Sequence, residues 1–313
     1  MILMGQHASA RDSTAWTVPT AETPGIHELV DTNGIRLHTV TAGPPDGDLV
    51  VLLHGFPEFW YAWKHQLPAL ADAGYRVVAP DLRGYNHSDK PEGVGAYHID
   101  ELVADVAGLV SAFDREQAHI VGHDWGGVIA WQTAIDRPDV VDQLAVLNAP
   151  HPSAYERALR HSVDQLLRSW YVLFFQLPAL PEASLGWNDF TMLERILTDG
   201  PTRPDAFTET DVRRYKRALG QPGARTAAVN YYRALGRRNA KLTLTAGGVG
   251  NRPVTASTLL IWGVQDDALS LDLTQDLEEW VPDCRVERLP AASHWVQFDA
   301  PEQVSELLLS HLP

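Results

Sequence analysis

The chain has 313 residues, a length that suits one large domain carrying an insertion. Its formal net charge of −15 would repel the phosphates of nucleic acids, which argues against nucleic acid as a partner. The only cysteine cannot form an internal disulfide, and no apolar run reaches the length that spans a bilayer. We therefore expect a cytoplasmic globular protein with no membrane partner.

The N-terminal residues 1–25 are predicted to form a flexible leader. Their apolar start, residues 1–4, is too short for a secretory signal, and residues 9–24 are rich in Ser, Thr and Ala. A β-hairpin is predicted next, because Asn33-Gly34 separates two runs of alternating apolar residues.

Further along the chain, short apolar runs predict strands, most of them buried on both faces. They alternate with residues 99–113 and 128–136, where apolar residues recur at helical spacing. Strands alternating with helices imply an α/β fold with a mostly parallel sheet flanked by helices, and with functional loops at the carboxyl ends of the strands. The strands are predicted at 49–53, 75–79, 119–121, 144–147, 258–262 and, at one edge, 285–289.

The alternation stops between residues 149 and 252, where the sequence becomes helical, aromatic and interrupted by prolines. We interpret this segment as a helical cap, or lid, inserted between two strands of the sheet. The predicted organisation is therefore a core domain formed by 26–148 and 253–313, with the cap domain at 149–252.

The turn Gly122-His-Asp-Trp-Gly-Gly127 lies between a predicted strand and a predicted helix. It has the form of the nucleophile elbow G-x-S-x-G, with Asp124 in the position of the serine. Small residues at Gly122 and Gly126 permit the tight turn, and the helix N-terminus favours a negative charge. A carboxylate needs no base to attack a saturated carbon, and the product is an ester that a second step must hydrolyse. Alternatively, Asp124 merely caps the helix.

Hydrolysis of such an ester needs a base and a carboxylate that orients the base. Proteins with this elbow carry the three groups in the order nucleophile, acid, histidine. His294 stands between the edge strand and a last helix, as this order requires. Asp266 and Asp267 both follow the strand 258–262, and the position in the turn favours Asp266. The other place that such proteins use for the acid holds Asn148, which cannot carry the charge.

An oxyanion hole is predicted after the first buried strand, in the segment His54-Gly-Phe-Pro-Glu58. The backbone N–H groups of Phe56 and Trp125 would stabilise the charge that develops during ester hydrolysis. An ordinary tight turn is the alternative interpretation of the His-Gly dipeptide.

Taken together, the motifs resemble those of the soluble epoxide hydrolases of the α/β-hydrolase fold. The resemblance rests on the His-Gly-Phe-Pro-Glu segment, on Asp81-Leu-Arg-Gly-Tyr85, on the elbow and on Ser293-His-Trp295, and it covers about residues 26–312. It implies that the protein opens an epoxide with water to a vicinal diol, through a covalent ester on Asp124, with His294 as base and Asp266 as orienting acid. It implies no metal and no organic cofactor.

The resemblance further implies two cap tyrosines that hold and protonate the epoxide oxygen. Residues 170–176 point to Tyr171, and residues 230–233 point to Tyr232 rather than Tyr231. The chemistry agrees, because a phenol with a pKa of about 10 can donate a proton to a departing alkoxide.

Other activities fit the motifs less well. Asp124 argues against a serine esterase. Haloalkane dehalogenases resemble a pattern with a halide donor where this chain has Phe56, and haloacetate dehalogenases one with arginines where it has Trp125 and Val128. A catalytically idle binding protein of this fold could lose any site residue freely, whereas all are present here.

The substrates are expected to be water and a small apolar or aromatic epoxide, because aromatic residues are abundant around the motifs. The sequence does not distinguish a monomer from a homodimer. The residues predicted to line the substrate pocket are His54, Pro57, Trp60, Phe174, Phe175, Trp187 and Phe190.

Overall fold

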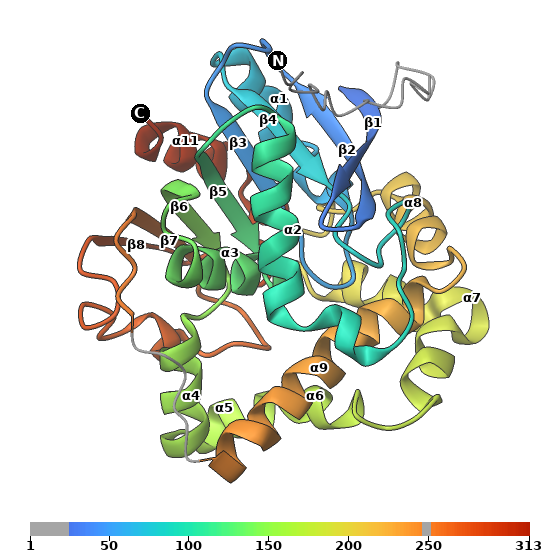
Figure 1. Ribbon diagram of the computed structural model, residues 1–313. Helices are drawn as coiled ribbons and strands as arrows, with labels where there is room; N and C mark the ends of the chain where they lie inside the picture. The colour runs from blue at the N-terminus through green and yellow to red at the C-terminus, as the bar shows by residue number, and fades with distance from the viewer. Residues whose placement is uncertain (1–24, 246–251) are drawn as a thin grey trace, which may run out of the picture.

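The computed structural model describes residues 25–245 and 252–313 (Figure 1). Nearly all of the predicted leader, and residues 246–251 of the predicted cap, lie outside the described residues. The described strands form one sheet in the order β1-β2-β4-β3-β5-β6-β7-β8. Their bounds are β1 (Ile26–Thr32), β2 (Ile35–Ala42), β3 (Leu49–Leu53), β4 (Arg76–Pro80), β5 (Ala118–His123), β6 (Val141–Leu147), β7 (Ser257–Gly263) and β8 (Cys284–Leu289).

The hairpin predicted at the N-terminal edge of the sheet is confirmed. β1 and β2 pair antiparallel, and Thr32 lies opposite Ile35 across a two-residue turn. Asn33 and Gly34 both have positive φ, 44° and 74°, which is the backbone twist that joins two strands with so short a turn. β2 is also antiparallel to β4, and every later pair in the sheet is parallel.

The centre of the sheet is apolar on both faces. All five residues of β3 are buried, as are all six of β5, because helices cover both sides of these strands. Figure 1 shows α2 and α3 on the viewer's face of the sheet, with α1 and α11 behind it. The helices of this core are α1 (Gln66–Asp72), α2 (Ile99–Ala112), α3 (Trp125–Asp136), α10 (Val296–Asp299) and α11 (Pro301–His311).

The described residues between β6 and β7 contain helices and no strand. These helices, here called the cap helices, lie beyond the carboxyl ends of the central strands in Figure 1. They are α4 (Pro152–His161), α5 (Val163–Arg168), α6 (Trp170–Phe174), α7 (Leu180–Asp199), α8 (Glu209–Leu219) and α9 (Ala224–Thr245).

Buried polar contacts fasten the cap helices to the core. The Asp211 carboxylate on α8 accepts hydrogen bonds from the Tyr61 hydroxyl, at 2.8 Å, and from the Lys64 ammonium, at 2.9 Å. On α9 the Tyr231 hydroxyl donates to the backbone carbonyl of Arg83 at 2.7 Å. A buried charge or hydroxyl is costly without a partner, so these contacts fix where the cap helices sit over the sheet.

The α/β fold with a mostly parallel, helix-flanked sheet is thus confirmed. The boundaries proposed between core and cap domains stay predictions. In the part of the chain that the structure describes, no helix combines the length and apolar character that crossing a bilayer requires.

Candidate active site

The strand-to-helix turn after β5 holds Asp124 in a strained conformation, with φ 49° and ψ −118°. Two glycines make the turn possible. A Cβ added at Gly122 would lie 2.3 Å from the carbonyl oxygen of Gly126, and one added at Gly126 would lie 2.0 Å from that of Leu53. The crossing of backbones leaves no room for side chains at either position, and the turn lifts Asp124 above the end of the sheet.

The Asp124 carboxylate lies between a backbone N–H donor and a histidine. The N–H of Phe56 donates to its Oδ1 at 2.7 Å, and Nε2 of His294 lies 3.6 Å from its Oδ2. Burial alone would raise the pKa of Asp124, but His294, His123 and the Phe56 N–H outweigh it and lower the pKa below its usual value. The carboxylate is therefore anionic at neutral pH while 18% of its surface stays open.

His294 is oriented by Asp266, which lies in the loop after β7. Nδ1 of His294 is 2.7 Å from Oδ2 of Asp266, so Nε2 faces Asp124. The other oxygen of Asp266 accepts the backbone N–H groups of Ala268 and Leu269, at 2.8 and 2.9 Å. Asp267, the alternative acid, has an exposed side chain that points to none of these groups.

The charges around His294 decide its protonation. Burial would lower its pKa, but Asp266 first and Asp124 second raise the pKa well above the ordinary imidazole value. His294 therefore carries a proton in the resting site, between two carboxylates. Loss of the negative charge on Asp124 would remove one of the two groups that raise this pKa.

The structure places the two cap tyrosines and Asp124 around the same cavity. Tyr232 on α9 packs edge-on against Phe56 and Trp125, with ring centroids 5.4 and 5.0 Å away. Tyr171 on α6 lies 5.9 Å from the Tyr232 ring. Burial, and then the nearby Asp124 charge, raises the pKa of Tyr232 well above 10, and burial does the same for Tyr171. Both phenols are therefore protonated and able to donate.

The neighbouring tyrosine, Tyr231, has a different environment. Its hydroxyl donates to the Arg83 carbonyl on the core, as described above, and its ring packs against Tyr85 and Tyr97. Adjacent residues on a helix point about 100° apart, which separates the two phenols.

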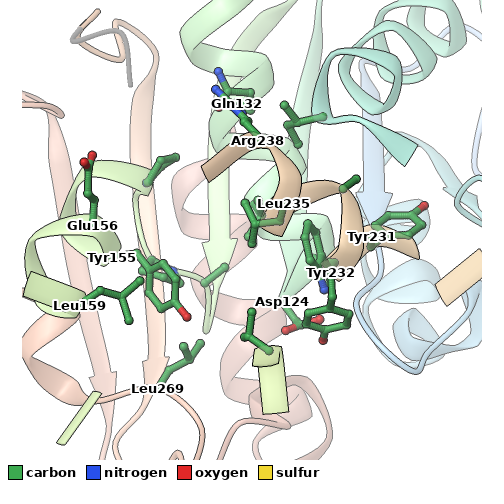
Figure 2. Close-up of a pocket in the computed structure, with 18 of the residues that line it drawn as sticks. Asp124, Gln132, Tyr155, Glu156, Leu159, Tyr231, Tyr232, Leu235, Arg238 and Leu269 are labelled. Atoms are coloured by element: carbon green, nitrogen blue, oxygen red, sulfur yellow. The ribbon is translucent and has the colours of Figure 1, made fainter. Parts of the chain in front are cut away.

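A cavity of about 540 Å³ opens beside Asp124, between the core and the cap helices. Figure 2 shows Asp124 and Tyr232 on one side of it and Tyr155, Glu156 and Leu159 of α4 on the other. Its apolar wall consists mainly of Val128, Ala149, Pro150, Pro152, Leu159, Val172, Ala234, Leu235 and Leu269.

None of the seven residues predicted to line the substrate pocket lines this cavity as the described residues form it. His54 is fully buried and accepts the Leu82 N–H, and Trp60 is buried against His27. Trp187 is 70% exposed at a break in α7. Pro57 and Phe175 are buried, and Phe174 and Phe190 are only partly exposed. An apolar residue can face core, cavity or solvent, and composition does not distinguish them.

Comparison with known proteins agrees with this geometry. A family model described as the alpha/beta hydrolase fold matches residues 48–301. Epoxide hydrolase 4 of Mus musculus is 37% identical over 286 residues, which cover 90% of this chain and 77% of that protein. Epoxide hydrolase A of Mycobacterium tuberculosis is 35% identical, over 91% of this chain and 96% of that protein. The chain belongs to the epoxide hydrolase family of the α/β-hydrolase superfamily.

Other relatives extend the comparison. The AB hydrolase superfamily protein YfhM of Bacillus subtilis is 46% identical over 91% of this chain and 97% of its own length. Among solved structures, a mutant epoxide hydrolase from Bacillus megaterium, complexed with its product diol, superposes with a TM-score of 0.82 at 30% identity. That match covers 91% of this chain and 99% of the other.

Two supporting features of this family member were not predicted from its sequence. Asn148, noted only for its missing charge, donates from its side chain to Oδ2 of Asp266 at 2.7 Å and accepts the Gly263 N–H at 2.9 Å. It thus links the ends of two neighbouring strands and holds the acid in place. Its position directly after β6 was the signal that could have revealed this.

The second feature is a fully buried polar group beneath the site. Nδ1 of His123 lies 2.8 Å from Glu58, which also accepts the Gly55 N–H, and Gln297 donates to the same carboxylate. Nε2 of His123 contacts the carbonyl oxygen of His294 at 2.8 Å. This group ties the loop after β3 to the backbone that carries His294. In the described ranges, no set of three or more His, Cys, Asp or Glu side chains is arranged to hold a metal ion.

Proposed function

We propose that the protein hydrolyses epoxides to vicinal diols through an alkyl ester of Asp124. The observation that carries the proposal is the arrangement of two protonated phenols, Tyr171 and Tyr232, on the open side of an anionic carboxylate. The carboxylate attacks one carbon of the epoxide, its C–O bond breaks, and the oxygen takes a proton from a tyrosine.

The second half-reaction hydrolyses the ester. Esterification removes the charge of Asp124, so the pKa of His294 falls and the imidazole can give up its proton and act as a base. The proton that His294 gives up restores the tyrosine that protonated the epoxide oxygen. Neutral His294 then removes a proton from water, and the water oxygen attacks the ester carbonyl. The bond from the carbonyl carbon to the alkyl oxygen breaks, the diol leaves with the proton of the new carboxyl group, and anionic Asp124 and protonated His294 are restored. The Phe56 N–H, already on Oδ1, would stabilise the oxyanion together with the N–H of Trp125, the first residue of α3 and one without an intrahelical partner.

The residues of the site fit dehalogenation less well than epoxide hydrolysis. Trp125 and Val128 line the cavity at the positions where an arginine clamp for a haloacetate would stand. A halide leaving group needs no proton, so a dehalogenase has no use for two buried phenols. The mainly apolar cavity wall supports a small apolar or aromatic epoxide as substrate, with water as the second reactant. The lone Cys284 needs no oxidising compartment, so the cytoplasm remains the predicted location.

Isotope labelling and a trapping variant test the covalent step. In a single turnover in ¹⁸O water, the first-turnover diol should contain no ¹⁸O, because its new oxygen comes from Asp124; one ¹⁸O atom in that diol would exclude the ester. His294→Gln should accumulate a protein species heavier by the mass of the epoxide. Assays of styrene oxide, a haloalkane and a nitrophenyl ester in parallel should show turnover of the epoxide alone.

A further inference from the structure

Three helices line the cavity with one face each, and two of these faces, on α3 and α9, begin next to Asp124 and Tyr232. In each helix the lining residues recur at the three- and four-residue spacing that places side chains on one side. They are Trp125, Val128 and Gln132 on α3; Pro152, Tyr155, Glu156, Leu159 and Arg160 on α4; and Tyr231, Tyr232, Ala234, Leu235 and Arg238 on α9.

The helical rise gives the length of this channel. Gln132 follows Trp125 by seven residues, and Arg238 follows Tyr231 by the same number, which corresponds to about 10 Å of helix in each case. Both stretches begin beside the reactive centre, because Trp125 follows the nucleophile and Tyr231 precedes Tyr232. Figure 2 shows Gln132 and Arg238 at the same end of the cavity, with Leu235 between Arg238 and Tyr232.

The middle of the channel is apolar and its far end is polar. Val128, Leu159, Ala234 and Leu235 present only carbon to the cavity, so this stretch fits a hydrocarbon chain or ring. Gln132 and Arg238 lie at the far end in Figure 2, and three further polar side chains line the cavity: Glu156, Arg160 and, just before α2, His98.

Within residues 25–245 and 252–313, one positive charge at this end has no partner that neutralises it. Arg160 is paired with Glu156, and the Gln132 amide donates to Asp136 at 2.7 Å. Arg238 is half-buried and makes no hydrogen bond or ion pair with any described residue. Acidic groups are abundant in a chain of net charge −15, so a partly buried guanidinium that has no partner in the described part of the chain is unusual.

We infer that Arg238 binds a carboxylate at the far end of the substrate. This rests on the proposed function and specifies its substrate class: an epoxide whose ring is separated by an apolar spacer of about 10 Å from a carboxylate. The planar fork of an arginine matches the two oxygens of a carboxylate, so one side chain is sufficient for recognition. The net negative charge of the protein repels a carboxylate at long range, whereas Arg238 attracts the carboxylate only once it is inside the channel.

The test compares an epoxy carboxylate of this spacing with its methyl ester. The preference of the wild-type protein for the acid, measured as the ratio of the two kcat/KM values, should fall about tenfold in Arg238→Gln, mainly through KM. Raising the salt concentration should weaken the wild-type preference in the same direction. The matched control is Arg237→Gln, at an exposed position outside the cavity, which should keep the wild-type preference.

Calorimetric binding of the diol carboxylate separates this inference from the proposed chemistry. The wild-type protein should bind it about tenfold more tightly than Arg238→Gln does, whether or not the epoxide is turned over. Equal affinities, or an unchanged acid-to-ester ratio in a variant that melts like the wild type, would overturn the role of Arg238. Turnover of neither epoxide by the wild type would instead overturn the proposed function.

Discussion

The two halves of the site are built very differently. The half on the core is held by buried hydrogen bonds: the Asp266 side chain is fully buried, and His294 and Asn148 both bond to it. The half on the cap includes α6, a five-residue helix without a single buried residue, which carries Tyr171 on one side and exposes Trp170 and Leu173 on the other.

This difference indicates which residues of the site the fold holds in fixed positions. In the proposed reaction the base and its acid need one geometry for the hydrolysis of any ester, and the ends of parallel strands provide rigid positions for them. The cap helices would contact the leaving oxygen and the rest of the substrate. Helices that are fastened at few points can change their lining residues without disturbing the sheet, so we expect substrate preference to reside there.

The largest effect is expected when the core half is broken. Asp266→Asn keeps the shape but no longer stabilises a charged His294, so hydrolysis of the ester should slow by about 10³ to 10⁴-fold. Alkylation of Asp124 should persist, and the covalent ester should build up in rapid-quench mass spectrometry. The matched control is Asp267→Asn, whose exposed side chain contacts none of these groups. Equal losses in both variants would contradict the assignment.

A variant of the cap half should slow the other half-reaction. Tyr232→Phe removes one proton donor, and the rate of alkylation in single-turnover experiments should fall about 10²-fold. The decay of the ester, once formed, should be affected much less. The adjacent variant Tyr231→Phe removes the hydrogen bond to Arg83, so its main effect is expected on the free energy of unfolding, at about 1 kcal/mol. If Tyr232→Phe slowed the decay of the ester more than its formation, Tyr232 would act in ester hydrolysis, which would contradict the proposal.

The pH dependence should separate the two halves as well. Ester hydrolysis needs neutral His294, so its rate should fall about tenfold for each pH unit below the pKa of that imidazole in the ester. Alkylation needs only anionic Asp124, whose pKa is lowered, and should continue into the ordinary carboxyl range near pH 4. Stopped-flow measurements at falling pH should therefore show a preserved burst and a vanishing steady state. If the burst of alkylation were lost at a higher pH than steady-state turnover, the roles assigned to Asp124 and His294 would be contradicted.

The smallest effect is expected at a residue that the sequence placed in the pocket. Trp187 is exposed, so Trp187→Gln should change stability by no more than about 0.5 kcal/mol. Its KM for styrene oxide should stay within a factor of two of the wild-type value, as measured in steady-state assays. A larger rise in KM would indicate that Trp187 contacts the substrate, which would contradict its exposed position in the structure.

Local patterns predicted much of the fold correctly. The hairpin at Asn33-Gly34, the strands and the two long core helices follow from periodicity and turn residues, and these act over a few neighbours in the chain. The elbow could be read in the same way, because Gly122 and Gly126 are required by contacts within one turn. These signals survive in a sequence because the interactions that they reflect are local.

Sequence motifs indicated which side chains could carry the chemistry: an aspartate in the elbow, a histidine before the last helix and two cap tyrosines. Which of these groups meet depends on the tertiary structure. It placed Asn148 on Asp266, turned Tyr231 away from Asp124, left the seven residues predicted to line the pocket outside the cavity and brought Arg238 to its far end. The reason is physical: contacts between segments distant in the chain depend on how whole helices pack, and an apolar or charged residue looks the same in sequence whichever way it faces.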